Sequence, residues 1–218
     1  MPPRYRNWLT HVFDHPVRDP AWFFDMDAPR FDAPSDEIVG LVTHTFLNCG
    51  QDLVGYSDGQ VNDGLNYIFN NSCSNVVFSL MDAGVPVDAR KRAIASIKHL
   101  YKQCFEERCA PVLGHIDEAG AKPINSICYM LWDVTPLSYW EADENKELFY
   151  SELLSVLRYA LGSSNAACIE SALHGLGHIQ LYRESQVTPI IQAFLRSNPK
   201  LRPELRQYAE NAAVGCVL

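Results

Sequence analysis

Several sequence patterns that identify common classes of protein are missing from this chain of 218 residues. No apolar run approaches the ~18 residues that a transmembrane helix needs, and the N-terminal sequence has no apolar segment of the kind that secretory signals carry. The seven cysteines include no Cys-x-x-Cys pair, and the chain has no glycine-rich phosphate loop and no His-Glu-x-x-His motif. We therefore expect a cytoplasmic protein without a membrane-spanning segment, whose thiols are reduced.

Positive charge is also scarce. The 18 lysines and arginines are outnumbered by 26 aspartates and glutamates, which gives a formal net charge of −8. Binding to nucleic acid or to an anionic membrane requires a cationic face, so we expect neither. A basic protein partner is compatible with this charge. Hydrophobic residues make up 47% of the chain, which is typical of a folded protein rather than a disordered one.

The first 34 residues differ from the rest in composition. Because proline removes a backbone donor and fixes φ, the many prolines in this segment predict an absence of long helices, while its aromatic rings predict packing against the body of the protein. We expect an extended N-terminal arm over residues 1–34 and a single helical domain over residues 35–218. The prolines are Pro2, Pro3, Pro16, Pro20, Pro29 and Pro34, and the aromatic residues between them are Trp8, Phe13, Trp22, Phe23, Phe24 and Phe31.

Helical patterns begin at Ser35. A serine followed by Asp36 and Glu37 is typical of a helix start, and apolar residues then recur at helical spacing up to Gly50. A second helix is predicted to begin at Ser57. Strand alternation is not sustained anywhere in the sequence, so the predicted fold class is all-α.

Two stretches of the sequence match each other at a fixed offset. Residues 93–100 (AIASIKHL) align with residues 172–179 (ALHGLGHI), with apolar positions over apolar positions and a histidine over a histidine. The offset is about twice the ~40-residue period of some helical repeat proteins. A third unit is predicted from a helix start at Pro189, and the unit between the two matching stretches would fall near residues 124–132.

Small residues occupy matching positions in the second helix of each predicted pair: Ala93, Ser96, Ala172, Gly175, Ala209 and Ala212. In this respect residues 74–218 resemble the HEAT and armadillo families of helical repeats. The resemblance implies a short right-handed α-solenoid built from helix pairs. Folds of this kind mostly bind other macromolecules, so the resemblance also implies a protein partner.

His174 and His178 are the residues of this chain that most resemble a metal-binding pair. They are four residues apart, so on a helix they share one face and can hold one divalent ion such as zinc. Glu170 continues the same row, but along a helix it lies ~12 Å from His178 and cannot bind the same ion. A third ligand must come from elsewhere, with His44, His99 or an acidic residue as candidates. The alternative is that the two histidines pack between the helices of a repeated scaffold.

A binding surface is predicted from side chains of several kinds. Aromatic residues are enriched in binding hot spots, and several of them lie beside an acidic residue in the segment 125–140, which breaks the regular helical pattern. A basic cluster begins at Arg90, where cations in the first turn of a helix oppose its dipole unless an acidic group meets them. The predicted surface consists of Tyr129, Trp132, Asp133, Trp140, Arg90, Lys91, Glu170, His174 and His178.

The sequence leaves two functions open. The first is a non-catalytic helical-repeat protein that needs no cofactor and binds a basic protein partner, as an immunity protein or an antitoxin does. The second is a metal-dependent enzyme of the hydrolase kind, centred on His174 and His178, with a divalent metal such as zinc as its cofactor. A stoichiometric protein partner would favour the first function, and a bound metal ion would favour the second.

Overall fold

The computed structural model describes residues 1–28 and 30–217, and within these residues every regular element is a helix. The α-helices are α1 (Pro3–Phe13), α2 (Ser35–Leu47), α3 (Cys49–Asp52), α4 (Asp58–Phe69), α5 (Val76–Ser79), α6 (Val87–Leu100), α7 (Glu106–Arg108), α8 (Pro123–Val134), α9 (Lys146–Leu161), α10 (Ala166–Ser197) and α11 (Pro203–Ala212). Two 3₁₀-helices, η1 (Trp22–Phe24) and η3 (Pro136–Ser138), and a π-helix, η2 (Tyr101–Phe105), complete the set. The predicted all-α class is confirmed. No helix in the described ranges is both long and apolar enough to cross a bilayer.

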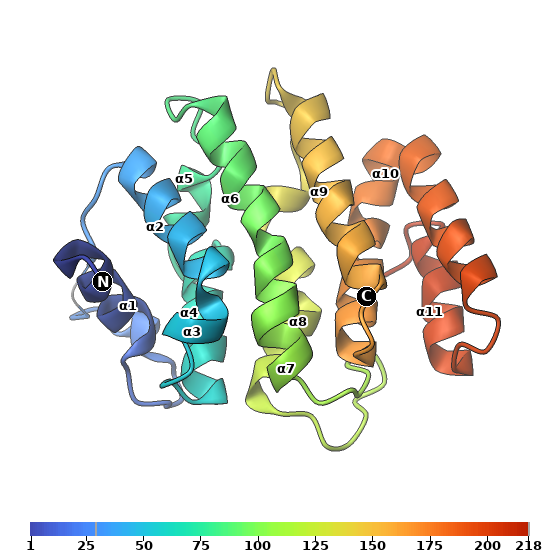
Figure 1. Ribbon diagram of the computed structural model, residues 1–218, viewed down its shortest axis with the longest axis horizontal. Coiled ribbons are helices and arrows are strands. Elements are labelled where there is room, and N and C mark those ends of the chain that lie inside the picture. The colour runs from blue at the N-terminus through green and yellow to red at the C-terminus, as the bar shows by residue number, and fades with distance from the viewer. Residues whose placement is uncertain (29, 218) are drawn as a thin grey trace.

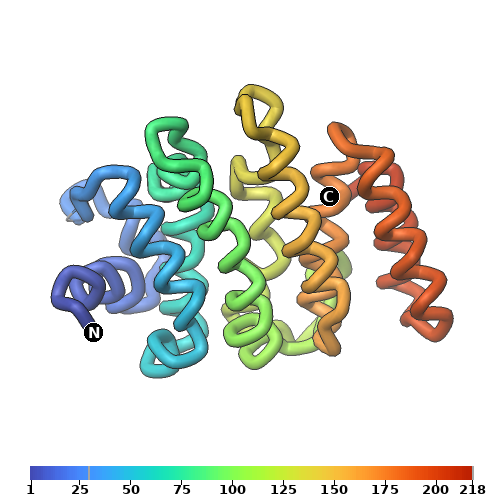
Figure 2. Tube along the Cα trace, turned by 45° about the horizontal axis from the view of Figure 1, so that its top comes forward, coloured from blue at the N-terminus to red at the C-terminus, as the bar shows by residue number. Residues whose placement is uncertain are grey.

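The longer helices lie side by side in two layers (Figure 1). In the layer nearer the viewer, α6 packs between α2 and α9. In the layer behind it, α8 packs between α4 and the first half of α10. α10 then turns near its middle, and α11 packs against it at the far end of the row (Figure 2). Successive long helices from α2 to α10 therefore alternate between the two layers.

The N-terminal segment contains a helix where an extended arm was predicted. Pro3 is the first residue of α1, a position that has no helical donor to lose and that suits the fixed φ of proline. Pro16 and Pro20 follow the end of the helix and do not interrupt it. The predicted packing against the body is present, because Trp8 is fully buried and its Nε1 donates a hydrogen bond to Thr45 Oγ1 at 3.0 Å.

The first two predicted helices of the body are confirmed as α2 and α4. α4 begins with a complete capping box, in which Ser57 Oγ accepts a hydrogen bond from the Gln60 backbone at 3.2 Å and Gln60 Oε1 accepts one from the Ser57 backbone at 3.0 Å. Such a cap satisfies two donors at the helix start and contributes about 1 kcal/mol. The start of α4 is thus fixed by local sequence.

The two matching stretches of sequence do not occupy equivalent places in the structure. α6 carries the first stretch in one layer, whereas α10 carries the second stretch in the other layer. The helix expected before α6 is α5, which has only four residues. The predicted register of the repeat is therefore wrong. A pattern of small and apolar residues marks a buried helix face, and helices of both layers need such a face, so the pattern does not identify the layer.

The third unit does not begin at Pro189 as predicted. α10 continues through this residue, and within the helix only Arg183 has non-helical backbone angles (φ −139°, ψ 41°). The chain therefore turns six residues before Pro189, which lies inside the helix. The guanidinium of Arg183 lies 4.1 Å from the ring centre of Tyr150 and forms an ion pair with Glu141 at 3.0 Å. These contacts hold the turn against α9 and against the loop that precedes α9.

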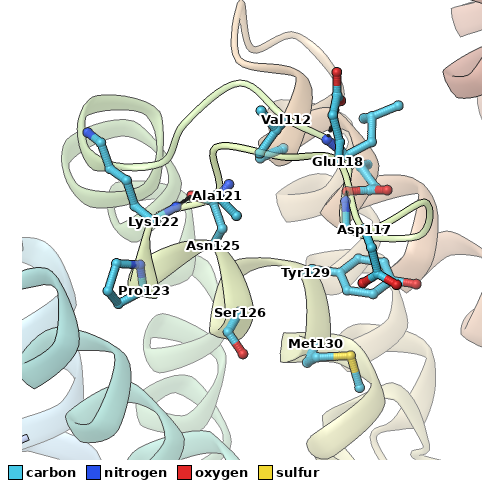
Figure 3. A pocket seen from close by; sticks show the side chains of 14 residues that line it. Val112, Asp117, Glu118, Ala121, Lys122, Pro123, Asn125, Ser126, Tyr129 and Met130 are labelled. Carbon is cyan, nitrogen blue, oxygen red and sulfur yellow. Dashed lines mark hydrogen bonds between the residues drawn. The ribbon is translucent and has the colours of Figure 1, made fainter.

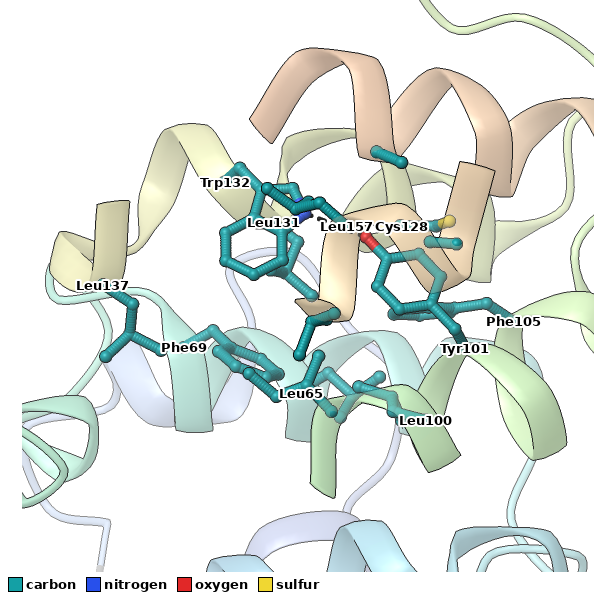
Figure 4. Close-up of a cluster of buried hydrophobic side chains, with 14 of the residues drawn as sticks. Leu65, Phe69, Leu100, Tyr101, Phe105, Cys128, Leu131, Trp132, Leu137 and Leu157 are labelled. Carbon is teal, nitrogen blue, oxygen red and sulfur yellow. Dashed lines mark hydrogen bonds between the residues drawn. The ribbon is translucent and has the colours of Figure 1, made fainter. Parts of the chain in front are cut away.

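The centre of the core lies between the two layers, where apolar side chains from α4, α6, α8 and α9 meet (Figure 4). Trp132 is fully buried there, and its Nε1 donates a hydrogen bond to the hydroxyl of Tyr101 at 2.9 Å. That hydroxyl also bonds to Ser171 Oγ at 2.7 Å. The two bonds satisfy polar groups that would otherwise destabilise the core. The segment 125–140, which was predicted to break the helical pattern, forms most of α8 and all of η3. A helix is therefore present where the unit near residues 124–132 was expected.

The docking of α1 can be tested at Gly64. A Cβ atom at this position would lie 2.2 Å from Cδ1 of Phe13, which is itself buried under α4. We expect Gly64→Ala to lower the free energy of unfolding by about 1–3 kcal/mol, because the ring has no room to move. Denaturant titration of the purified protein measures this change.

Gly40→Ala is the matched control, because a Cβ atom at Gly40 on α2 would meet nothing within 4 Å. This substitution should raise the free energy of unfolding by up to about 1 kcal/mol, through the higher helix propensity of alanine. Equal effects of the two substitutions would contradict the packing of α1 on α4.

Candidate metal centre

Three side chains from two neighbouring helices converge on one point. Asp133 is near the end of α8, and His174 and His178 are in the first half of α10. One ligand atom of each lies within 4.8 Å of the others, and Nε2 of His178 is 3.5 Å from Oδ1 of Asp133. The structure thus places an acidic residue, one of the predicted kinds of third ligand, beside the predicted histidine pair. The other candidates, His44 and His99, lie on α2 and α6 in the opposite layer.

The close approach of α8 to α10 depends on Gly175. A Cβ atom at this position would lie 2.7 Å from Cγ of Trp132 and 2.8 Å from Cδ2 of Leu157. Because Gly175 has no side chain, the Trp132 ring can lie directly against α10. The next residue, Asp133, is thereby carried to the histidines. A glycine inside a helix costs about 1 kcal/mol relative to alanine, and close packing is the physical reason for it here.

Both imidazoles of the cluster are neutral at pH 7. Burial lowers the pKa of His174 to about 4, the neighbouring His178 lowers it further, and Asp133 acts in the opposite direction. Burial also lowers the pKa of His178, again against the effect of Asp133. A neutral imidazole has a lone pair on one nitrogen, which is the form that binds a metal ion.

The Nε2 atoms of these two histidines have no hydrogen-bond partner among the described residues, although both are buried. His174 is only 1% exposed. Leaving a buried polar atom unpaired costs roughly 1–3 kcal/mol, and here two such atoms belong to rings whose centres are 4.8 Å apart. An ion or a water molecule between them would remove this cost.

A second histidine pair with the same spacing shows the ordinary outcome. His11 and His15 are also four residues apart at the end of α1, but both of their Nε2 atoms have partners. The Nε2 of His11 bonds to the hydroxyl of Tyr67 at 3.1 Å, and that of His15 bonds to the His11 carbonyl at 2.7 Å. The spacing alone therefore does not create the unpaired nitrogens at His174 and His178.

Tyr208, which the sequence analysis did not select, supports the cluster from α11. Its hydroxyl and Nδ1 of His174 form a hydrogen bond of 2.7 Å. Its ring stacks on the His115 ring with centres 4.4 Å apart. Burial raises the pKa of Tyr208, and the nearby Tyr129 side chain raises it further. Because Tyr208 lies 34 residues beyond His174 and outside any local motif, no sequence signal indicated this contact.

Glu170 lies outside the cluster, as its distance along the helix predicted, and has a different role. It is 1% exposed and accepts hydrogen bonds from the backbone of Gly114 at 2.7 Å and of His115 at 3.1 Å. Its carboxylate also bonds to Nδ1 of His115. Three donors thus compensate the buried carboxylate, which anchors the loop before α8 to α10.

A cavity of about 550 Å³ lies beside this anchor, between the loop 112–123 and the helices α8 and α10 (Figure 3). Glu170 and Tyr129, two residues of the predicted binding surface, lie in its wall. The Tyr129 ring also packs edge-on against His174, with ring centres 5.0 Å apart. The volume is within the range of small-molecule sites, and Tyr129 is shared between the cavity and the histidine cluster.

Three other residues of the predicted surface are buried and cannot form it. Trp132 and Trp140 are at most 1% exposed, and Arg90 is 2% exposed. Arg90 pairs with Asp143 at 2.8 Å and lies over the Phe149 ring. The acidic group that meets the basic cluster at this point is thus Asp143 of the same chain and not a residue of a partner. Lys91, the next residue, is only partly buried.

The sequence Gly55–Gly59 reads GYSDG and matches the Gly-x-Ser-x-Gly pattern of some hydrolases. That pattern carries a nucleophile only where a strand turns into a helix. Here Ser57 follows a turn after α3, and its hydroxyl caps α4. Within the described residues no hydrogen bond joins Ser57 to an imidazole. This serine is a structural residue.

Searches for similar proteins find no matching family model, no matching curated protein and no matching solved structure. The geometry of the site is therefore the basis for assigning its chemistry.

The buried His174 should make stability depend on pH. Its pKa is about 4 in the folded protein and near 6.5 when exposed, so between these values the unfolded chain binds more protons. The free energy of unfolding should then fall as pH falls from about 6.5 to about 4, by up to about 1.4 kcal/mol per pH unit from this residue. His174→Asn, which does not titrate, should show a shallower slope in denaturant titrations without added metal.

His44→Asn is the control for this measurement, because His44 is exposed on α2 and away from the cluster. Its slope should equal that of the unmodified protein. An unchanged slope for His174→Asn would contradict the burial of a neutral imidazole at this position.

Proposed function

We propose that this protein binds one divalent transition-metal ion through Asp133, His174 and His178, and that it is a metal-dependent enzyme of the hydrolase kind. The ligand set combines two imidazole nitrogens with one carboxylate oxygen, which suits zinc and also iron(II). Zinc is the natural first probe, because it is redox-inert and binds such mixed sets at four-coordinate sites.

The observation that carries this proposal is the pair of buried Nε2 atoms without a hydrogen-bond partner among the described residues, on two histidines that are grouped with Asp133. An ion would satisfy both nitrogens at once and would also neutralise Asp133. The ligand atoms lie within 4.8 Å of one another, so the side chains would have to move closer to hold one ion at the ~2.0–2.2 Å that zinc requires. A bridging water would satisfy the same atoms, and metal titration separates the two cases.

Three protein ligands distinguish a catalytic site from a structural one, because zinc in structural sites has four. The remaining position of a bound ion would be open to water, since Asp133 is exposed and His178 is only partly buried. A zinc ion held by Asp133, His174 and His178 would lower the pKa of water to about 7 and would so supply hydroxide for attack on an ester or amide. This access is the reason for proposing an enzyme rather than a structural metal site.

We also propose that the two layers are a short α-solenoid of helix pairs, as the HEAT resemblance implies. The alternation of successive long helices between layers supports this architecture. The repeat register differs from the predicted one, and among successive long helices from α2 to α10 the most extensive direct packing is that of α9 against α10. Binding of a basic protein partner stays a prediction, which the net charge of −8 favours.

The metal site is tested by titrating the metal-stripped protein with zinc, cobalt(II) and iron(II). We expect one zinc ion per chain, and loss of binding in His174→Ala and His178→Ala. Bound ion at 100 times its dissociation constant should raise the free energy of unfolding by about 2.7 kcal/mol. Isothermal calorimetry and thermal unfolding measure the two effects.

His44→Ala is the matched control and should bind the ion as the unmodified chain does, because His44 lies on α2. If the unmodified chain binds none of these ions, or if the two histidine variants bind them equally well, the proposal is wrong and a water molecule fills the site.

The enzymatic part of the proposal has a separate test. Zinc-loaded protein should hydrolyse an activated ester such as p-nitrophenyl acetate, with a rate that chelation abolishes and added zinc restores. Asp133→Asn should reduce the rate at saturating zinc, because the carboxylate would no longer fix the ion. Tight zinc binding without any chelator-sensitive hydrolysis would leave a metal-binding protein and remove the proposed hydrolase.

A further inference from the structure

We infer that Tyr208 is a positioning residue for the metal site, because its hydroxyl accepts the Nδ1–H of His174 and thereby leaves Nε2 of His174 free to bind the ion. This inference rests on the proposed metal site. It assigns the last helix, α11, a part in a centre whose ligands all come from α8 and α10.

The geometry around Tyr208 leaves its hydroxyl little freedom. The side chain is 4% exposed, and its ring is stacked on His115. Glu170 in turn holds His115 through a side-chain bond and a backbone bond. The ring therefore cannot swing away, and its oxygen stays 2.7 Å from Nδ1 of His174.

The contact with Tyr208 depends on which nitrogen of His174 holds the proton. A neutral imidazole has one N–H, so His174 can offer its Nε2 lone pair to an ion only when the proton is on Nδ1. With the ion bound, Nδ1–H must donate, and the Tyr208 oxygen is the acceptor beside it. Metal-binding histidines generally depend on such a partner for their other nitrogen.

Tyr129 completes the arrangement. A tyrosine hydroxyl has a single proton, so when Tyr208 accepts from His174 it donates its own proton elsewhere. The side chain of Tyr129 interacts with that of Tyr208 and can accept that proton. The order in the metal-bound protein is thus His174 to Tyr208 to Tyr129. Without the ion the chain can also run the other way, so metal binding fixes its direction.

The first test compares zinc affinity in three proteins. Tyr208→Phe removes the acceptor while keeping the ring, so zinc should bind 10- to 100-fold more weakly, the usual effect of losing such a partner. Tyr139→Phe is the matched control, because Tyr139 is 49% exposed and its ring packs edge-on against that of Tyr182, outside the cluster. It should bind zinc as the unmodified protein does.

A spectroscopic measurement separates positioning from general stability. In zinc-loaded, nitrogen-15-labelled protein, His174 should show a proton on Nδ1 that exchanges slowly with water. Tyr208→Phe should make this proton exchange faster even where circular dichroism shows an unchanged fold. A His174 whose proton is on Nε2 in the zinc-loaded protein would overturn the inference.

If Tyr208→Phe does not fold, Tyr129→Phe gives the same test one step further along the chain. It leaves the Tyr208–His174 contact in place but removes the acceptor for the Tyr208 proton, so zinc binding should weaken several-fold. If the unmodified chain binds zinc and the tyrosine variants bind it with the same affinity, the role of Tyr208 is refuted and the metal site stands. Failure of the unmodified chain to bind zinc would remove both.

Discussion

The close packing of α8 against α10 at Gly175 is the constraint on which the candidate site depends. The Trp132 ring occupies the space that a side chain at Gly175 would fill, and it anchors the centre of the core through Tyr101. Asp133 follows Trp132 directly, so the same contact that closes the core also brings a carboxylate to the histidines. A larger residue at Gly175 would therefore disturb packing and site together.

Several buried polar groups close to the histidine pair are well compensated, and the pair differs from them. Glu170 has three donors, and the Tyr101 hydroxyl has two partners in the core. His174 is satisfied on one nitrogen and unpaired on the other. The two imidazole nitrogens differ from the other buried side-chain atoms of the described residues that lack a hydrogen-bond partner, because they are grouped with a third possible ligand, Asp133. Those other atoms are Trp22 Nε1, Arg90 Nε, Glu141 Oε1 and Arg183 Nε.

The features that could be predicted from the sequence depend on interactions between residues close together in the chain. The start of α4 depends on Ser57 and Gln60, three residues apart, and the spacing of His174 and His178 fixed their common face. The layer to which each helix belongs was not predictable, because α6 and α10 carry similar patterns for different neighbours. Asp133 was selected as a surface residue, and its approach to the histidines depends on packing between α8 and α10. The prediction of an extended N-terminal arm was wrong at Pro3, because the effect of a proline depends on its position. Pro3 is the first residue of α1, where a proline does not prevent a helix.

The location of Tyr208 in α11 also bears on how the site forms as the chain is made. Both histidines and Asp133 precede the turn at Arg183, whereas the residue that orders their protons comes after it. Domains fold as their segments emerge during synthesis, so a chain that ends before α11 would have all three ligands and no acceptor for His174. Tight metal binding would then require α11 to have docked against α10.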